Sequence, residues 1–548
     1  MNEHAIYHIS SGSYCYPVGG TTLRVRLRLA RDEALEIRLH YQNIYDHKSP
    51  FFSVAMGRLF SDRLFDYFEA EISLEWKRFK YFFEIAAGGD RHFFGSEGLT
   101  DAVKEKECFF YPYINGDDVA MMPEWARGEI IYQIWVDRFW NGDQSNDPEG
   151  AQSPDVLPDR DTYYGGDFDG VMRKLPYIRD LGAGIIYLNP VFDSPSYHKY
   201  DIRDYAKIDA AYGSKEKLRQ LVDKAHGMGI RVILDGVFNH CSSENALFAD
   251  VVNRGEESPY RSWFCIDSFP VTAGQYDSFG GLVPSMPRFN TSDPGLIEYL
   301  TDIADYWTGY LGIDGWRLDV ADEVSHRLWR EFRRRLCGKY PDILLLGEIW
   351  NQAAPWLDGS GMHTATNYRY RKYALAFSSG AINSRTFWEK YNADNSLYRT
   401  TLYDYRVNLM GSHDTARLLH VAGDKRRALL LQVLTLTLKG MPLIYYGDEI
   451  PMEGGEDPDN RRAMRWERIN SEFHDRIRQI GVLRRDGNAL RKGTQEIRET
   501  EPRVLAFIRT YGEERVAAAL NFGSEPSQVE FDGATWTLRP LDYRVEPL

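Results

Sequence analysis

The stretch Gly312–Val320, GIDGWRLDV, ends in a short apolar segment that carries two opposite charges. Arg317 and Asp319 are two positions apart, so in a β-strand both side chains point to the same face. Burying charged groups is costly unless they are paired and hydrogen-bonded. The segment therefore predicts a core strand with an ion pair on one face, and the rest of the chain decides what that pair does.

Strand–helix alternation surrounds this segment from about residue 129 onward. Short apolar runs such as IIYQIWV and GIIYLNPVF alternate with amphipathic helices, two of which are expected near 168–181 and 214–228. Alternation of this kind implies a parallel sheet. Seven strands are clear and an eighth is expected between 362 and 376, which predicts an α/β fold with an eight-stranded (β/α)8 TIM barrel.

The pattern differs on either side of the barrel. Alternating polar and apolar residues predict an N-terminal β-sandwich over residues 1–121. The catalytic barrel is expected over 122–460. From 461 to 548 the chain returns to short β runs such as RVLAFIRTY and RVAAALNF, which predict a C-terminal β-sandwich.

Four of the expected strands end in acidic residues, namely Asp235, Asp319, Glu348 and Asp414. In barrels of this kind the catalytic side chains lie at the carboxyl ends of the strands. Asp319 and Glu348 are about one strand–helix–strand unit apart, so we expect them on adjacent strands. Their carboxyls could then reach the separation of roughly 5 Å that a retaining glycosidase needs. The longer interval between Asp235 and Asp319 predicts an inserted subdomain at about 241–292, after the third strand.

Composition excludes several classes of partner. The net charge is −14 and no long run of Lys or Arg occurs, which argues against nucleic acid or an anionic membrane as the main partner. No uninterrupted stretch of about 18 apolar residues occurs, so the sequence predicts no membrane span. The five cysteines are widely spaced without a CxxC pair, and the N-terminus lacks the pattern of a signal peptide. We therefore expect reduced thiols, a cytoplasmic location and a neutral partner.

Four segments, DGVFNH, GWRLDV, GEIW and SHD, resemble in this order the signature regions of the α-amylase family of glycoside hydrolases, family 13. A fifth, MPRFN at 286–290, is similar to the form found in the cyclomaltodextrinase, neopullulanase and maltogenic amylase subgroup, which places a starch-binding-type domain before the barrel. The resemblance covers nearly the whole chain. It implies a retaining hydrolase of α-1,4, and secondarily α-1,6, glucosidic bonds in cyclomaltodextrins, maltodextrins and pullulan. A transglycosylase or isomerase of the same family stays open, as does a non-catalytic sugar-binding homologue.

Carried over residue by residue, the resemblance implies that Asp319 is the nucleophile and Glu348 the general acid and then base. Asp414 matches the third acid, which binds substrate hydroxyls. The neighbouring Arg317 is expected to keep the Asp319 carboxylate ionised, which gives the ion pair a purpose. The other expected substrate-binding residues are His240, His413, Asp235, Tyr200, His198, Asp322, Glu323, Phe289, Trp356 and Arg462.

Three of these residues are aromatic. Tyr200 is expected to stack on the cleaved sugar, whereas Phe289 and Trp356 either stack on sugar or belong to the core. Asp322 and Glu323 are expected on the acceptor side. Here the chain reads VADEV where the subgroup usually has VANEV, so Asp322 replaces an asparagine.

Oxygen-bearing side chains gather in the glycine-containing stretch NGDQSNDP. Such oxygen donors suit Ca2+, although an Asx-rich turn would explain this stretch taken alone. Its resemblance to the calcium loop of the subgroup implies a structural Ca2+, and no organic cofactor is expected because two carboxylates suffice for the chemistry. The expected ligands are Asn141, Asp143, Asn146, Asp147, Gly165 and Asp167.

The proteins that the chain resembles usually form dimers. In them the N-terminal domain of one subunit narrows the cleft of the other, which favours small substrates over starch. The resemblance therefore implies a homodimer that binds α-glucan oligosaccharides and cyclodextrins.

Overall fold

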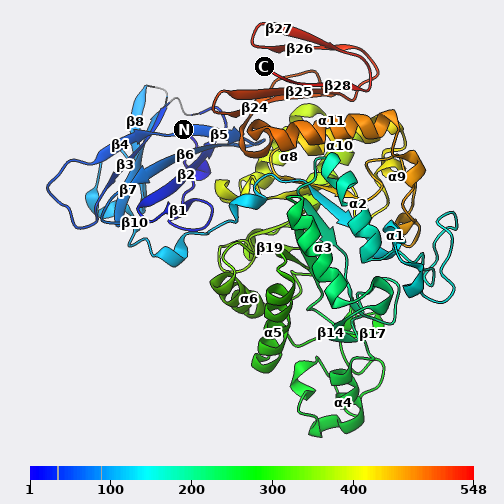
Figure 1. The fold of residues 1–548 in the computed structure, drawn as a ribbon. Helices are drawn as coiled ribbons and strands as arrows, with labels where there is room; N and C mark the ends of the chain where they lie inside the picture. Colours follow the sequence, from blue (N-terminus) through cyan, green and yellow to red (C-terminus); the bar gives the residue numbers. More distant parts are fainter. Residues whose placement is uncertain (34–35, 88) are drawn as a thin grey trace. The chain divides into compact units, whose positions relative to one another are not determined.

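The computed structural model describes residues 1–33, 36–87 and 89–548 (Figure 1). It divides into two compact units. The first contains Met1–Met121, Leu357–Gly359 and Ile382–Tyr403. The second contains Met122–Trp356, Ser360–Ala381 and Asp404–Leu548.

Two antiparallel sheets form the first unit. One has the order β1 (Cys15–Gly19), β2 (Thr22–Ala30), β6 (Phe65–Ser73), β5 (Gly57–Ser61). The other has the order β4 (Phe52–Ala55), β3 (Glu36–Gln42), β7 (Phe79–Ala87), β8 (Asp90–Gly95), β9 (Gly98–Thr100), with β10 (Phe109–Tyr111) paired to β7. Alternate residues of β2, including Leu23, Val25 and Leu27, share one buried cluster with Phe79 and Phe83 of β7. The predicted N-terminal sandwich is confirmed.

A helix that follows the barrel helix α7 in sequence belongs to this first unit. α8 (Ser384–Asn395) contacts β5, and the Asn392 side-chain amide donates to the Ser61 carbonyl at 2.8 Å. Arg26 in β2 donates to the Ser396 carbonyl at 2.9 Å. The sequence did not indicate that α8, which follows a barrel helix, belongs to the first unit.

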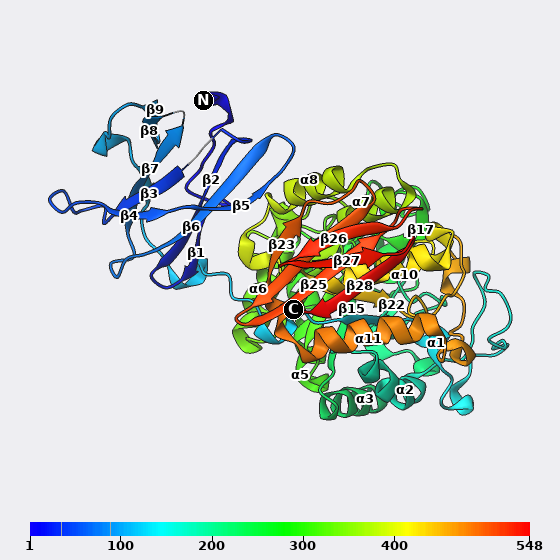
Figure 2. The ribbon, with the colours of Figure 1, turned by 90° about the horizontal axis from the view of Figure 1, so that it is seen from above.

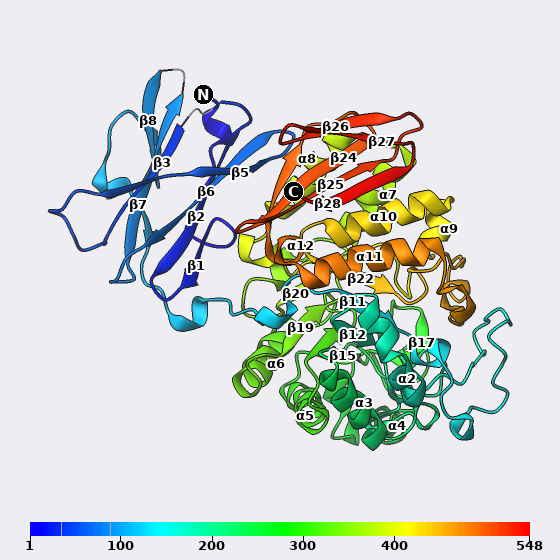
Figure 3. The ribbon, with the colours of Figure 1, turned by 45° about the horizontal axis from the view of Figure 1, so that its top comes forward.

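Eight parallel strands close a barrel in the second unit, as predicted (Figure 3). All residues of the second, fourth and fifth barrel strands are buried, which explains their continuous apolar runs. The eighth strand expected between 362 and 376 is β20. In order around the barrel the strands are β11 (Ile131–Ile134), β12 (Ile185–Leu188), β15 (Arg231–Gly236), β18 (Gly315–Leu318), β19 (Leu344–Gly347), β20 (Thr364–Asn367), β21 (Val407–Leu409) and β22 (Met441–Tyr445).

Helices lie outside the barrel strands (Figure 3). In α3 the residues Leu218, Leu221, Val222 and Ala225 form a buried stripe, and the Ser214 hydroxyl caps the helix by accepting from the Lys217 amide. The helices predicted near 168–181 and 214–228 are thus confirmed. The helices are α1 (Val136–Phe139), α2 (Phe168–Asp180), α3 (Lys215–Gly227), α5 (Pro294–Leu311), α6 (His326–Lys339), α7 (Tyr368–Ser379), α9 (Leu418–Ala422), α10 (Lys425–Thr437) and α11 (Glu472–Asp486).

An inserted segment follows the third barrel strand, where it was predicted. It contains α4 (Ala246–Arg254), β16 (Ser278–Phe279) and β17 (Val283–Pro287), and it extends from one end of the barrel (Figure 1). A small hairpin of β13 (Phe192–Asp193) and β14 (Asp204–Ile208) follows β12.

The C-terminal part begins with helices, whereas 461–548 was predicted to be entirely β. In α11 the residues Ile477, Ile480 and Arg484 are buried on one side, and the short α12 (Asn488–Lys492) follows. The antiparallel sheets come next and lie over α10 and α11 in Figure 2. They contain β23 (Thr494–Arg498), β24 (Val504–Tyr511), β25 (Glu514–Asn521) and β28 (Asp542–Pro547), with the pair β26 (Ser527–Phe531) and β27 (Ala534–Leu538).

Within the described ranges, no helix has the length and apolar character that a membrane crossing requires.

Candidate active site

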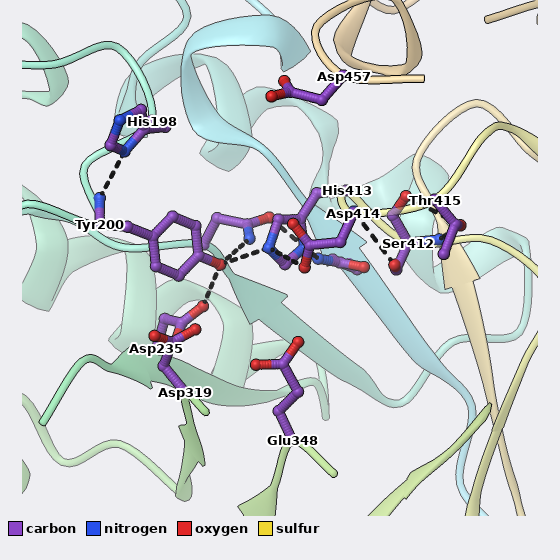
Figure 4. Close-up of polar contacts among 12 residues, drawn as sticks. His198, Tyr200, Asp235, Asp319, Glu348, Ser412, His413, Asp414, Thr415 and Asp457 are labelled. Atoms are coloured by element: carbon purple, nitrogen blue, oxygen red, sulfur yellow. Dashed lines mark hydrogen bonds and ion pairs between the residues drawn. The ribbon is translucent and has the colours of Figure 1, made fainter. Parts of the chain in front are cut away.

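The carboxyl ends of three adjacent barrel strands bring acidic residues together. Asp235 in β15 is paired in register with Arg317 in β18, and Asp319 and Glu348 come directly after β18 and β19. Leu318 is in register with Gly347, so Asp319 and Glu348 leave the barrel at the same level. Figure 4 shows the three carboxyl groups gathered beside Tyr200. The adjacent placement expected from the sequence is confirmed.

Arg317 is the centre of this cluster. Its Nη1 lies 2.7 Å from Asp319 Oδ1 and 2.9 Å from Asp235 Oδ1, and its Nη2 lies 2.9 Å from Glu348 Oε1. The Arg317 side chain is only 3% exposed. The sequence suggested an ion pair between Arg317 and Asp319, with Asp235 helping to orient Arg317. In the structure the guanidinium contacts both of these carboxyls and that of Glu348.

Burial raises the pKa of Asp319 well above its usual range; the neighbouring Glu348 charge adds to the rise and Arg317 opposes it. One guanidinium contacts all three carboxyls of this buried cluster, so burial and the charged neighbours together decide the ionisation of Asp319. The Val320 amide and the Trp350 indole donate to Glu348 at 3.0 and 3.3 Å, which fixes its position.

Asp414 lies on the opposite side of the site with His413 (Figure 4). His413 Nε2 is 2.9 Å from Asp414 Oδ2, and Arg461 Nη2 is 3.3 Å from Asp414 Oδ1. Burial acts to raise the pKa of Asp414, but the charges of His413 and Arg461 outweigh it and hold this pKa below its usual value. The Gln133 side-chain amide lies 2.7 Å from His413 Nδ1, and Nε2 of the same ring faces Asp414.

Tyr200 connects the two sides. Its hydroxyl lies 2.8 Å from Asp235 Oδ2 and 2.7 Å from His413 Nε2, and its ring stacks on His413 at 5.3 Å with an interplanar angle of 7°. Two further histidines contact its backbone. His198 Nδ1 accepts from the Tyr200 amide at 3.1 Å, and His240 Nε2 donates to the Tyr200 carbonyl at 3.1 Å. Burial lowers the pKa of His198 to about 4 and that of His240 to about 3, so both are neutral donors or acceptors near neutral pH.

Arg462 was expected to bind substrate, but its neighbour Arg461 is the arginine that contacts Asp414. Arg462 forms a fork with Asp459 at 2.7 and 2.9 Å, so its guanidinium is already engaged. Its neighbour Arg461 contacts Asp414 and also lies 2.8 Å from Asp457. The sequence PDNRRAMRWE contains both arginines, and only the backbone path after β22 decides which one faces the site.

A cavity of about 300 Å3 lies beside the segment that follows β18. Asp322, Glu323 and Trp356 line it, and Trp356 stacks on His326 at 5.4 Å. Burial raises the pKa of Asp322. Phe289 is 1% exposed and packs against Phe264 at 5.2 Å, so its ring belongs to the core of the insert, the second of the two alternatives considered for it.

The loop predicted to bind calcium has an uneven set of donors. The Asp167 carboxylate accepts from the amides of Gly142, Asp143 and Gly170, so it caps α2 and holds the loop. The side-chain oxygens of Asn141 and Asn146 are buried and lack a hydrogen-bond partner.

Gly165 packs against these donors. It has φ +74°, and a Cβ there would approach Asp147 Oδ1 to 2.5 Å. Over the described residues, no group of three His, Cys, Asp or Glu side chains forms a metal cluster. The asparagine oxygens and Asp147 therefore fit a hard cation better than Asp167 does.

Comparison with known proteins agrees with this geometry. Residues 133–489 match the alpha amylase catalytic domain and residues 1–115 the alpha amylase N-terminal ig-like domain. The chain is 40% identical to neopullulanase 2 of Thermoactinomyces vulgaris, over 98% of this chain and 94% of that protein. It is 38% identical to a cyclomaltodextrinase of Geobacillus thermopakistaniensis, over 96% and 92% of the two chains. A solved cyclomaltodextrinase structure superposes with a TM-score of 0.92 at 36% identity, covering 96% of this chain and 93% of that one.

The match to the alpha amylase catalytic domain and to relatives over nearly the full length identifies the chain as a glycoside hydrolase. The chain belongs to the alpha-amylase family, and it is an enzyme of the cyclomaltodextrinase, neopullulanase and maltogenic amylase type.

Proposed function

We propose that the enzyme hydrolyses α-1,4, and more slowly α-1,6, glucosidic bonds with retention of configuration. Its substrates are cyclomaltodextrins, short maltodextrins and pullulan. The observation that carries this proposal is the sharing of one guanidinium by Asp319 and Glu348 at the ends of adjacent strands. Retaining enzymes need two close carboxyl groups in different protonation states.

In the first step Asp319 attacks the anomeric carbon while Glu348 gives its proton to the departing glycosidic oxygen. This forms a glycosyl ester on Asp319 and frees one end of the glucan. In the second step Glu348 takes a proton from water, the water oxygen attacks the anomeric carbon, and Asp319 leaves as carboxylate. Arg317 stabilises the carboxylate charge that appears on each partner in turn.

Asp414 and His413 are suited to bind hydroxyls of the same sugar. The lowered pKa of Asp414 keeps it ionised, so it accepts hydrogen bonds, and His413 Nε2 lies 2.9 Å from its Oδ2. Asp235 lies behind Arg317 and receives the hydroxyls of Tyr187 and Tyr200, the latter at 2.8 Å, which suits a positioning role.

Two measurements test the mechanism. NMR of the products of β-cyclodextrin opening should show the α-anomer first, and inversion would overturn the proposal. Glu348→Gln incubated with an activated fluoroglucoside should accumulate a mass adduct on Asp319. The control Glu216→Gln changes an acid on the outer helix α3 and should behave as the parent. An adduct on any other residue would contradict the assignment.

The preference for small substrates is tested with β-cyclodextrin, soluble starch and pullulan offered separately at equal mass. Rapid ring opening to maltose with slow attack on starch is the expected result. Starch consumed as fast as the ring would contradict the proposed substrates and leave the roles of Asp319 and Glu348 intact.

The cavity beside the segment that follows β18, on the proposed acceptor side, favours sugar transfer as a second reaction of the same intermediate. Asp322, Glu323 and Trp356 offer two acids and an aromatic ring beside the strand that ends at Glu348. Acids and aromatic faces suit sugar hydroxyls and ring faces. Added maltose should therefore divert product into longer oligosaccharides. Its failure to change the products at any concentration would remove transfer from the proposal.

We also propose a structural Ca2+ in the loop that follows α1. The ion would be held by Asn141, Asn146 and Asp147, with Asp143 as a further donor. It would stabilise the loop by bridging these side chains and would take no part in bond cleavage. Thermal unfolding after chelation, with Ca2+ or Mg2+ restored, tests this. An unchanged Tm would contradict it.

We further propose a cytoplasmic homodimer. All five cysteines are free in the described structure, which fits a reducing compartment. On the first unit Tyr45, Phe52 and Trp76 are 75%, 54% and 59% exposed, a supply of apolar surface that suits a subunit contact. Sedimentation of the full chain against a Phe52→Ser/Trp76→Ser variant tests the dimer, and a parent that sediments as a monomer contradicts it.

A further inference from the structure

A basic groove lies on the outer surface of the barrel, between α5 and α6. Its volume is about 690 Å3, within the range of small-molecule sites. Pro294, Ile297 and Glu298 of α5 line it together with Glu331 and four arginines of α6, Arg327, Arg330, Arg334 and Arg335. Arg327, Arg330 and Arg334 are spaced i, i+3 and i+7, so they share one face of the helix. The opposite face, with Leu328, Trp329, Phe332 and Leu336, is buried.

α6 carries many more positive than negative side chains. α6 contains five arginines and one acid, Glu331. Glu331 pairs with Arg334 at 2.9 Å. Arg327 and Arg330 donate to neutral oxygens, the Ser292 carbonyl at 3.2 Å and the Ser360 hydroxyl at 3.3 Å. Neither forms an ion pair in the ranges that the structure describes. Glu298 of α5 and Glu331 of α6 also line the groove, where arginines outnumber acids by four to two.

Local physics disfavours this arrangement in the absence of an anion. Arg327 is in the first turn of α6, where the helix dipole repels positive charge, and arginines at i and i+3 repel each other. The whole chain is acidic, with net charge −14, so Arg327 and Arg330 form a positive patch on a negatively charged protein. An anion in the groove relieves both repulsions, and guanidinium forks suit phosphate oxygens.

We propose that this groove binds a small phosphorylated metabolite, with the phosphate on Arg327 and Arg330 and the organic part over Pro294 and Ile297. The groove is much larger than a phosphate ion needs, and its apolar residues lie beside the cations. A sugar phosphate is the class that matches this size and charge.

Isothermal titration with ribose 5-phosphate and, separately, inorganic phosphate tests the proposal. Ribose 5-phosphate should bind one to a chain and more tightly than inorganic phosphate. The Arg327→Gln/Arg330→Gln variant should bind it at least tenfold more weakly while opening β-cyclodextrin at the parental rate. The matched control Arg219→Gln, an exposed arginine of α3 that donates to the Tyr310 carbonyl, should bind as the parent does.

Three results would overturn the proposal. The first is no binding of either compound at 10 mM, which is roughly the upper end of weak metabolite affinity. The second is equal affinity of the parent and the double variant. The third is either of two results that point to another ligand. Equal affinity for inorganic phosphate and ribose 5-phosphate would make the groove a site for a bare ion, and binding of heparin without binding of ribose 5-phosphate would make it a site for an acidic polymer.

Two contacts join the groove to the proposed acceptor side. His326, one residue before Arg327, stacks on Trp356, and Arg330 donates to Ser360 in the loop after Trp356. A bound phosphate therefore acts on acceptor binding, an effect that rests on the proposed function. By linkage, maltose should change the affinity for ribose 5-phosphate severalfold. Unchanged affinity would overturn the coupling and leave the binding site, which the first titration decides.

Discussion

Replacing Arg317 with lysine tests whether the shared guanidinium, and not its charge alone, prepares Asp319 and Glu348, the two carboxyls proposed to be catalytic. Arginine reaches Asp319 with Nη1 and Glu348 with Nη2, at 2.7 and 2.9 Å. Lysine keeps one positive charge but has a single ammonium group, which cannot reproduce the planar fork. Arg317→Lys should therefore lose the contact to Glu348 while keeping the one to Asp319 or Asp235.

The size of the effect follows from that lost contact. A hydrogen bond to a charged group contributes about 1.5–3 kcal/mol, and about 1.4 kcal/mol corresponds to a tenfold change in rate. The loss of one such contact should lower kcat/KM roughly 10- to 150-fold. Arg317→Gln removes the charge as well. Burial and the Glu348 charge then raise the pKa of Asp319 without opposition, so the acid limb of the kcat/KM profile should move to higher pH.

Initial rates of β-cyclodextrin opening between pH 4 and 9 measure both effects, and circular dichroism confirms folding. Arg203→Lys is the matched control, because Arg203 also forms a fork, with Asp193 at 2.8 and 2.7 Å, outside the site. It should leave kcat/KM unchanged. Arg317→Lys within threefold of the parent, or an acid limb of Arg317→Gln at the parental pH, would refute the reasoning.

Three further outcomes concern stability. Gly165→Ala should lower the Tm and weaken Ca2+ binding, because alanine is strained at φ +74° and its Cβ meets Asp147 Oδ1 at 2.5 Å; calorimetry with and without Ca2+ checks this. Phe332→Ala should cost about 3–5 kcal/mol in urea unfolding, since Phe332 is fully buried. Burial lowers the pKa of His8 to about 4, so the unfolded chain binds the extra proton. The contribution of His8 to stability, complete above pH 6.5, should then fall by up to roughly 1.4 kcal/mol per pH unit down to pH 4. His8→Gln should lessen the slope by the share of this one histidine, because burial also lowers the pKa of His198 and His240.

The sequence carried the barrel and its acids because both depend on local patterns. Apolar runs followed by amphipathic helices predict parallel strands, and Asp319 and Glu348 needed only their positions at two consecutive strand ends. The insert after β15 was readable from an interval too long for one helix. The helices α11 and α12 were missed because the β runs after them dominated the interpretation of that region.

Choices between neighbouring residues required the tertiary structure. Arg461 and Arg462 are adjacent and chemically identical, and the chain path after β22 alone turns Arg461 toward Asp414. Phe289 lies within MPRFN, a segment that resembles a motif of the family, yet packing against Phe264 buries its ring. Asp167 has the chemistry of a metal ligand, but three backbone amides occupy its carboxylate.

The ion pair in GWRLDV shows the same division. The spacing of Arg317 and Asp319 determined that both side chains share a face of one strand, because β-strand side chains alternate. That the same guanidinium also holds Asp235 and Glu348 came from two neighbouring strands, whose register is fixed by closure of the barrel. The sequence thus identified the acidic residues of the candidate site. Only the barrel, which places residues remote in the chain around one cation, determined that Arg317 contacts all three carboxyls.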